Sequence, residues 1–192
     1  MTAPAPAPSD GKGRSKSVAL RRDCLATTVP QGERVSLSAG GLVTLVQSLG
    51  GSFTVRTEMG TLLRIDGADC DALGLEAPER RVQILSGGPF NMDKVTEALH
   101  TVYDPEIPVS IVELGLIYRC DEVIDAGGKR HIQIDMSMTA PGCGMGDVLR
   151  ADAGRAVAAL PGVDEVDVTL VWEPPWSVDR MSEEARLQLG LL

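Results

Sequence analysis

Turn residues are the feature that most constrains how this chain folds. Its 192 residues include 21 glycines and 12 prolines, which interrupt helices and strands. The segments between them are therefore short. Only 3% of the residues are aromatic, so the core must be built largely from Val, Leu, Ile, Ala and Met. Together these features predict an α+β protein made of many short elements.

The composition and the apolar periodicity of the sequence change along the chain. The first residues combine Ala-Pro repeats with Lys and Arg and have no apolar periodicity, which is typical of disorder. Short β-rich runs follow, and after a Gly-Gly-Pro break the pattern becomes mixed. The predicted order is a disordered basic tail (1–21), a small β-rich module (22–76), a linker (77–90) and a compact α+β domain (91–192).

Five β-rich runs, each ended by turn residues, make up the predicted module. They lie at about ten-residue spacing, which fits a small barrel-like arrangement or a meander. The positions expected to point inward in the last hairpin are Phe53, Val55, Leu63 and Ile65.

The C-terminal domain is predicted to have the order α-β-β-α-β-α. Asn91 and Ser182 are expected N-caps of its first and last helices. Residues 131–138 alternate apolar and polar side chains, which indicates a half-buried strand. In the third strand the positions expected to point inward are Val166, Val168, Leu170 and Trp172.

Charge and hydropathy exclude two classes of partner. The formal net charge is −9, whereas nucleic-acid binding depends on Lys and Arg that neutralise phosphates. No apolar run approaches the roughly 20 residues needed to cross a bilayer. The N-terminus also lacks an apolar leader, so a cytoplasmic location is expected, where thiols stay reduced.

Cys143 is the first candidate for chemistry. It lies in a Pro-Gly-Cys-Gly loop directly before a predicted helix, so free backbone N–H groups and the positive helix end would face its sulfur. Such a position lowers the pKa of a thiol and favours the thiolate, which attacks electrophiles and binds metals. The alternative is that Cys143 is a small buried apolar side chain.

The second candidate is a group of carboxylates, Asp104, Glu106 and Glu113, in the loop after the first helix. Pro105 and Pro108 stiffen this loop, so its acids could be held against a thiol or a metal. Alternatively, Asp104 turns the chain and the glutamates are solvated, because isolated surface acids are common.

The remaining chemistry-bearing residues give weaker signals. Cys24, Cys70 and Cys120 are expected in or near the core, and neither His100 nor His131 belongs to a catalytic motif. Trp176, which follows Pro174-Pro175, is either an exposed anchor for a partner or a lid on the sheet.

Three segments carry a family resemblance: DPEIPVSIVELGLIY (104–118), MTAPGCGMGDVL (138–149) and VWEPPWSVDRMSEEARLQLGL (171–191). Together they resemble the metal–sulfur cluster assembly domain of SufT-type iron–sulfur cluster assembly proteins, and the module before them is similar to an N-terminal extension found in that group. The resemblance implies a factor that matures iron–sulfur proteins. It also implies that Cys143 is the reactive cysteine and that Asp104 and Glu113 are supporting acids. Family members usually have Pro after this cysteine, whereas this chain has Gly144, which implies a looser loop.

The resulting hypothesis is a non-enzymatic maturation factor. Cys143 would bind iron or an iron–sulfur cluster for a short time, with no tightly bound cofactor, or would engage a client. The expected partners are client apoproteins and other assembly proteins, and a homodimer formed around paired Cys143 loops is predicted. Two alternatives stay open: a cysteine-dependent hydrolase or thiol transferase, and a pure client-docking adaptor that uses Trp176.

Overall fold

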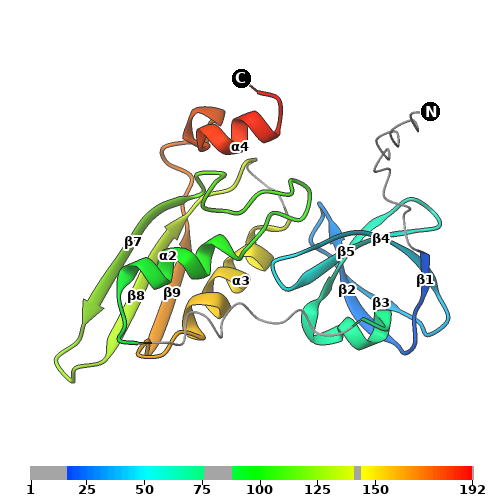
Figure 1. Cartoon of the computed structure of the whole chain (residues 1–192), viewed down its shortest axis with the longest axis horizontal. Coiled ribbons are helices and arrows are strands. Elements are labelled where there is room, and N and C mark those ends of the chain that lie inside the picture. Colours follow the sequence, from blue (N-terminus) through cyan, green and yellow to red (C-terminus); the bar gives the residue numbers. More distant parts are fainter. Residues whose placement is uncertain (1–16, 76–87, 141–143, 192) are drawn as a thin grey trace, which may run out of the picture.

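The computed structural model describes residues 17–75, 88–140 and 144–191 and has an α+β fold (Figure 1). The strands are β1 (Ser17–Ala19), β2 (Cys24–Val29), β3 (Arg34–Leu37), β4 (Leu42–Leu49), β5 (Ser52–Thr57), β6 (Leu62–Asp66), β7 (Ile117–Ile124), β8 (Arg130–Met136) and β9 (Glu165–Leu170). The helices are η1 (Gly67–Leu73), α2 (Met92–His100), α3 (Gly146–Ala158), η2 (Val178–Arg180) and α4 (Glu183–Gln188). Within the described ranges, no helix is both long and apolar enough to span a bilayer.

The N-terminal module is a six-stranded antiparallel sheet with the order β1-β4-β5-β6-β2-β3. The five predicted strands are present, and β1 adds a sixth inside the segment predicted to be a disordered tail. It pairs with β4, and the next residue, Leu20, is buried. β1 and β3 form the two edges and do not pair with each other, so the described residues form no closed barrel.

Alternation along the strands builds the core of the module. The four side chains predicted to point inward, Phe53, Val55, Leu63 and Ile65, are all buried. Their polar neighbours along β5 and β6 occupy the opposite face, as the period of two requires. Cys24 and Cys70 are also buried in this cluster, which confirms their predicted place in the core.

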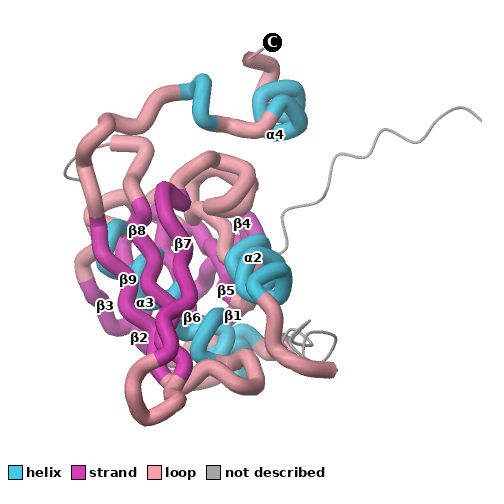
Figure 2. Tube along the Cα trace, turned by 90° about the vertical axis from the view of Figure 1, so that its left-hand side faces the viewer, coloured by secondary structure: helices cyan, strands magenta, loops and turns pink. Residues whose placement is uncertain are grey.

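The C-terminal domain contains a three-stranded sheet with the order β7-β8-β9. β7 and β8 are antiparallel, and β8 and β9 are parallel because α3 carries the chain back across the sheet. The helices α2 and α3 lie on one face of the sheet (Figure 2), where Ile132, Ile134 and Met136 of β8 are buried. The expectation for Trp172 is wrong: β9 ends at Leu170, so the strand alternation no longer applies and the indole is 43% exposed.

Side-chain caps start two of the helices where the sequence predicts. Asn91 accepts a hydrogen bond from the backbone N–H of Lys94 at the start of α2. Ser182 accepts one from Ala185 at the start of α4. Each cap satisfies a backbone donor that the helix itself leaves unpaired.

The module packs against the C-terminal domain. Arg64 on β6 forms a buried ion pair with Asp152 on α3, and Arg155 on α3 pairs with Asp66 at the end of β6. Val29 of β2 packs in the core of the C-terminal domain rather than in that of the module. The interface therefore combines apolar packing with paired charges.

Candidate functional site

The loop before α3 is the centre of the candidate site. Cys143 itself lies outside the described residues, which resume at Gly144. α3 begins at Gly146, with Met145 as its N-cap residue and no side-chain hydrogen bond to cap it. The predicted helix is thus present three residues after Cys143, and within the described ranges no side chain accepts a capping hydrogen bond from its first N–H groups.

Gly144 lies directly against the turn between β2 and β3. A Cβ atom built on Gly144 would overlap the carbonyl oxygen of Gln31 and would lie 2.9 Å from the backbone nitrogen of Gly32. Conversely, a Cβ on Gly32, whose φ is +77°, would overlap the carbonyl oxygen of Gly144. Two glycines therefore allow the backbones to meet. The sequence suggested only a looser loop at Gly144, and the structure supplies a packing reason for glycine there.

Asp104 stabilises the turn in which it lies. Its carboxylate is buried and accepts hydrogen bonds from the backbone N–H groups of Glu106 and Ile107, both at 2.9 Å. Burial raises the pKa of Asp104, and the two N–H donors oppose that change. This geometry fits the second interpretation of the residue, in which Asp104 turns the chain.

Glu113 connects this loop to the C-terminal helix. Its carboxylate accepts a hydrogen bond from the Ser182 hydroxyl, and its backbone carbonyl accepts one from the Ser182 N–H at 2.9 Å. The other carboxylate oxygen lies 3.5 Å from Nδ1 of His100. In the described part of the chain, no hydrogen bond or ion pair joins Glu113 or Asp104 to Gly144 or Met145.

The two tryptophans have different environments. Trp176 is half-buried against the domain core and donates a hydrogen bond from Nε1 to the carbonyl oxygen of Leu114 at 2.7 Å. This position corresponds to the predicted lid, whereas Trp172 presents more of its surface to solvent.

The other cysteines are buried or half-buried, and the histidines contact other side chains. Burial raises the pKa of the Cys24 and Cys120 thiols. His100 lies 3.4 Å from the Ser110 hydroxyl, and His131 lies between two carboxylates, Asp125 and Glu165. Across the described ranges, no three His, Cys, Asp or Glu side chains come together as a metal site.

Sequence reasoning did not find the contact between the loop and the module. Gln31 and Gly32 lie more than a hundred residues from Gly144 in the chain, and their sequence reads as an ordinary turn. The one available signal was Gly144 itself, a glycine at a position where the resemblance implied a proline.

Comparisons with known proteins agree on the C-terminal domain. A family model described as an iron-sulfur cluster assembly protein matches residues 92–168. The Fe-S protein maturation auxiliary factor of Porphyromonas gingivalis is 42% identical over 100 residues, which are 52% of this chain and 91% of that protein. The auxiliary factor SufT of Staphylococcus aureus is 37% identical over 90 residues, 47% of this chain and 98% of that protein.

A longer protein contains a similar segment. The iron-sulfur cluster carrier protein of Synechocystis is 36% identical over 83 residues, 43% of this chain and 22% of that protein. These matches define the class of protein, a factor for the maturation of iron–sulfur proteins. The chain belongs to the iron–sulfur cluster assembly protein family, which confirms the resemblance over the C-terminal domain and the predicted class of function.

Proposed function

We propose that Cys143 is a transient thiolate ligand for iron or an iron–sulfur cluster, which the chain delivers to apoproteins as cargo. The observation that carries this proposal is the start of α3. The helix begins three residues after Cys143, and among the described residues no side-chain hydrogen bond caps its start at Met145. A helix N-terminus favours negative charge, so it stabilises a nearby thiolate relative to the thiol.

The remaining cysteines are poorer ligands. Cys24 and Cys70 are buried in the core of the module, away from solvent. Cys120 is half-buried on β7, and burial raises its pKa. A thiol whose charged form is disfavoured is a weak nucleophile and a weak metal ligand. Cys143 is therefore the cysteine that we propose as the ligand.

The number of ligands explains why binding would be transient. Common iron–sulfur clusters are held by four cysteine thiolates, and this loop supplies one. The others must come from a client apoprotein, another assembly protein or a second copy of the chain, as in the predicted homodimer. The module lies against Gly144 on one side of the loop, so the partner would approach from another side.

A carrier fits these residues better than a cysteine-dependent enzyme. Such an enzyme needs a base within hydrogen-bond reach of its thiol. In the described residues, His100 is next to Ser110 and Glu113, and His131 is next to Asp125 and Glu165. A reducing compartment such as the cytoplasm would keep the thiol free for ligation.

Cluster transfer tests the proposed function. The full chain is loaded anaerobically with iron and sulfide and mixed with an apoprotein that needs a [4Fe–4S] cluster, and recovery of the recipient's activity is followed. The wild type and the Cys120→Ser control should activate the recipient, while Cys143→Ser should lose most of the transfer rate. Transfer by Cys143→Ser at the wild-type rate would show that this thiol does not carry the cargo.

A further inference from the structure

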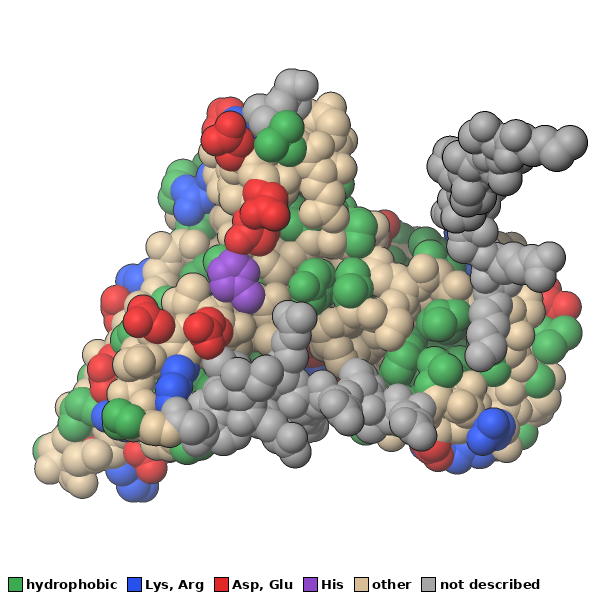
Figure 3. Space-filling view, viewed as in Figure 1, with side chains coloured by type: hydrophobic (Ala, Val, Ile, Leu, Met, Phe, Trp, Pro, Cys, Tyr) green, Lys and Arg blue, Asp and Glu red, His purple; other side chains and the backbone are tan. Residues whose placement is uncertain are grey.

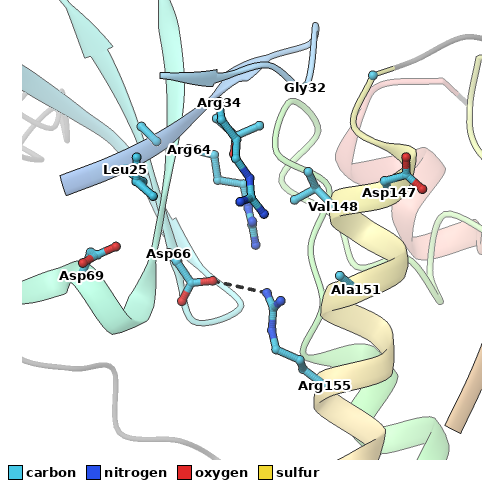
Figure 4. A pocket seen from close by; sticks show the side chains of 13 residues that line it. Leu25, Gly32, Arg34, Arg64, Asp66, Asp69, Asp147, Val148, Ala151 and Arg155 are labelled. Atoms are coloured by element: carbon cyan, nitrogen blue, oxygen red, sulfur yellow. Dashed lines mark hydrogen bonds and ion pairs between the residues drawn. The ribbon is translucent and has the colours of Figure 1, made fainter. Parts of the chain in front are cut away.

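A cavity lies between the sheet of the module and α3. Its volume is about 420 Å³, which falls within the usual range for small-ligand pockets. One wall is formed by β2, β3 and β6, and the other by the first turns of α3 (Figure 4). Gly32 and Gly144 also border the cavity, so it reaches the loop that follows Cys143.

Two arginines and a threonine form a row across the sheet wall. Thr27 of β2 pairs with Arg34 of β3 on one side and with Arg64 of β6 on the other. Residues directly opposite one another on neighbouring strands point to the same face of a sheet. Both arginine side chains accordingly extend into the space in front of α3 (Figure 4). From the same register, the Thr27 side chain lies on this face between them.

The other charged groups of the cavity wall already have partners. Arg64 is bound to Asp152 and is almost fully buried. The pairs formed by the remaining wall residues are Arg155–Asp66, Arg22–Asp69 and Arg150–Asp147.

Arg34 is different. In the described part of the chain, its guanidinium has no ion pair or side-chain hydrogen bond, although it points into the cavity (Figure 4). Arg34, an exposed residue, is therefore the one charged side chain of the cavity wall that has no ion-pair partner among the described residues. Arginine presents several N–H donors in a planar fork, which suits carboxylate and phosphate oxygens.

We propose that this cavity binds a small organic or inorganic anion, whose carboxylate or phosphate group is held by Arg34 and Thr27 beside Arg64. Arg34 supplies the charge, the Thr27 hydroxyl supplies a further hydrogen bond, and Arg64, fixed by Asp152, adds donors that its ion pair leaves available. The ligand lies at the junction of the module and α3 and stabilises their contact. This proposal does not depend on the role of Cys143.

Calorimetric titration of the full chain tests the site. The probes are citrate, for the carboxylate class, and inorganic phosphate, with chloride at equal ionic strength as the blank. At least one probe should bind the wild type, and the better one identifies the class of anion. Arg34→Gln should weaken that binding about tenfold or more, which corresponds to the loss of about 1.4 kcal/mol.

Arg56→Gln is the matched control. Arg56 is an exposed arginine on β5 of the same module and does not border the cavity, so its removal should leave the affinity unchanged. The proposal is overturned if neither probe binds the wild type, or if Arg34→Gln binds as tightly as the wild type. An equal loss in both variants would also overturn it, because it would indicate nonspecific attraction to positive charge.

Discussion

Two carboxylates of the loop after α2, those of Asp104 and Glu113, form hydrogen bonds that stabilise the structure around them. Asp104 accepts two backbone N–H groups, and Glu113 binds the Ser182 residue that caps α4. Both residues thus hold the chain around the start of α4 and the turn after α2 in place. A side chain already committed to such bonds is costly to replace because its buried partners lose their acceptor.

The buried carboxyl of Asp104 predicts a pH dependence of stability. Its pKa is raised in the folded state above the ordinary value of 3.8, so the folded protein binds more protons than the unfolded chain above that pH. Stability contributed by the protonated form is therefore lost as pH rises through the raised pKa. Each tenfold difference in proton affinity between the folded and unfolded states corresponds to a loss of about 1.4 kcal/mol.

The Asp104→Asn variant isolates this effect because it keeps an acceptor oxygen but does not titrate. Urea unfolding of both proteins from about pH 3.5 to about pH 6 gives the difference in the free energy of unfolding. As pH rises, the free energy of unfolding of the wild type should fall relative to that of Asp104→Asn. A difference that is constant with pH, or that turns in favour of the wild type, would contradict the role of burial at Asp104.

At the scale of elements, the loop before α3 and the turn between β2 and β3 fit together through two glycines. Gly144→Ala places a methyl group against the Gln31 carbonyl, so the two backbones must separate. Overpacking of this kind typically costs about 1–3 kcal/mol. Amide hydrogen exchange in residues 28–34 should accelerate in this variant, since the turn loses its support.

Gly154→Ala is the control for this substitution. It lies on α3, where a Cβ would meet only Val168 Cγ2, at an ordinary 3.7 Å. Amide hydrogen exchange in residues 28–34 of Gly154→Ala should match that of the wild type. Unchanged exchange in Gly144→Ala would mean that the turn does not depend on contact with the loop.

Local patterns predicted the elements well, and their contacts poorly. The caps at Asn91 and Ser182 depend on residues within one helical turn, so they were readable from the sequence. β1 was missed because three residues beside a Pro- and Lys-rich segment carry almost no periodic signal. Trp172 was misplaced because the sequence does not mark where β9 ends.

At the scale of the whole molecule, the N-terminal module is joined to the family domain, and the matched maturation factors lack this module. The factors from P. gingivalis and S. aureus are covered by the match over 91% and 98% of their lengths, which leaves no room in them for the module. In this chain the module packs on α3 through Arg64 and Asp152. That pair joins residues 88 positions apart, and neither looks different from a surface charge in the sequence.

The charge of the molecule is also uneven. Residues 93–192 contain 18 acidic and 8 basic side chains. On the face shown in Figure 3, acidic side chains gather over the part that contains α2 and α4. Partners that dock on this face would be expected to carry complementary positive charge.

Direct spectroscopy of the loaded protein tests the central claim, that Cys143 ligates the cargo. The full chain is reconstituted anaerobically with iron and sulfide, and absorption and Mössbauer spectra are compared for the wild type, Cys143→Ser and the half-buried control Cys120→Ser. Iron–sulfur signals should appear in the wild type and in Cys120→Ser, and should be lost in Cys143→Ser. Signals of equal intensity in all three proteins would show that iron is held elsewhere and would contradict the account.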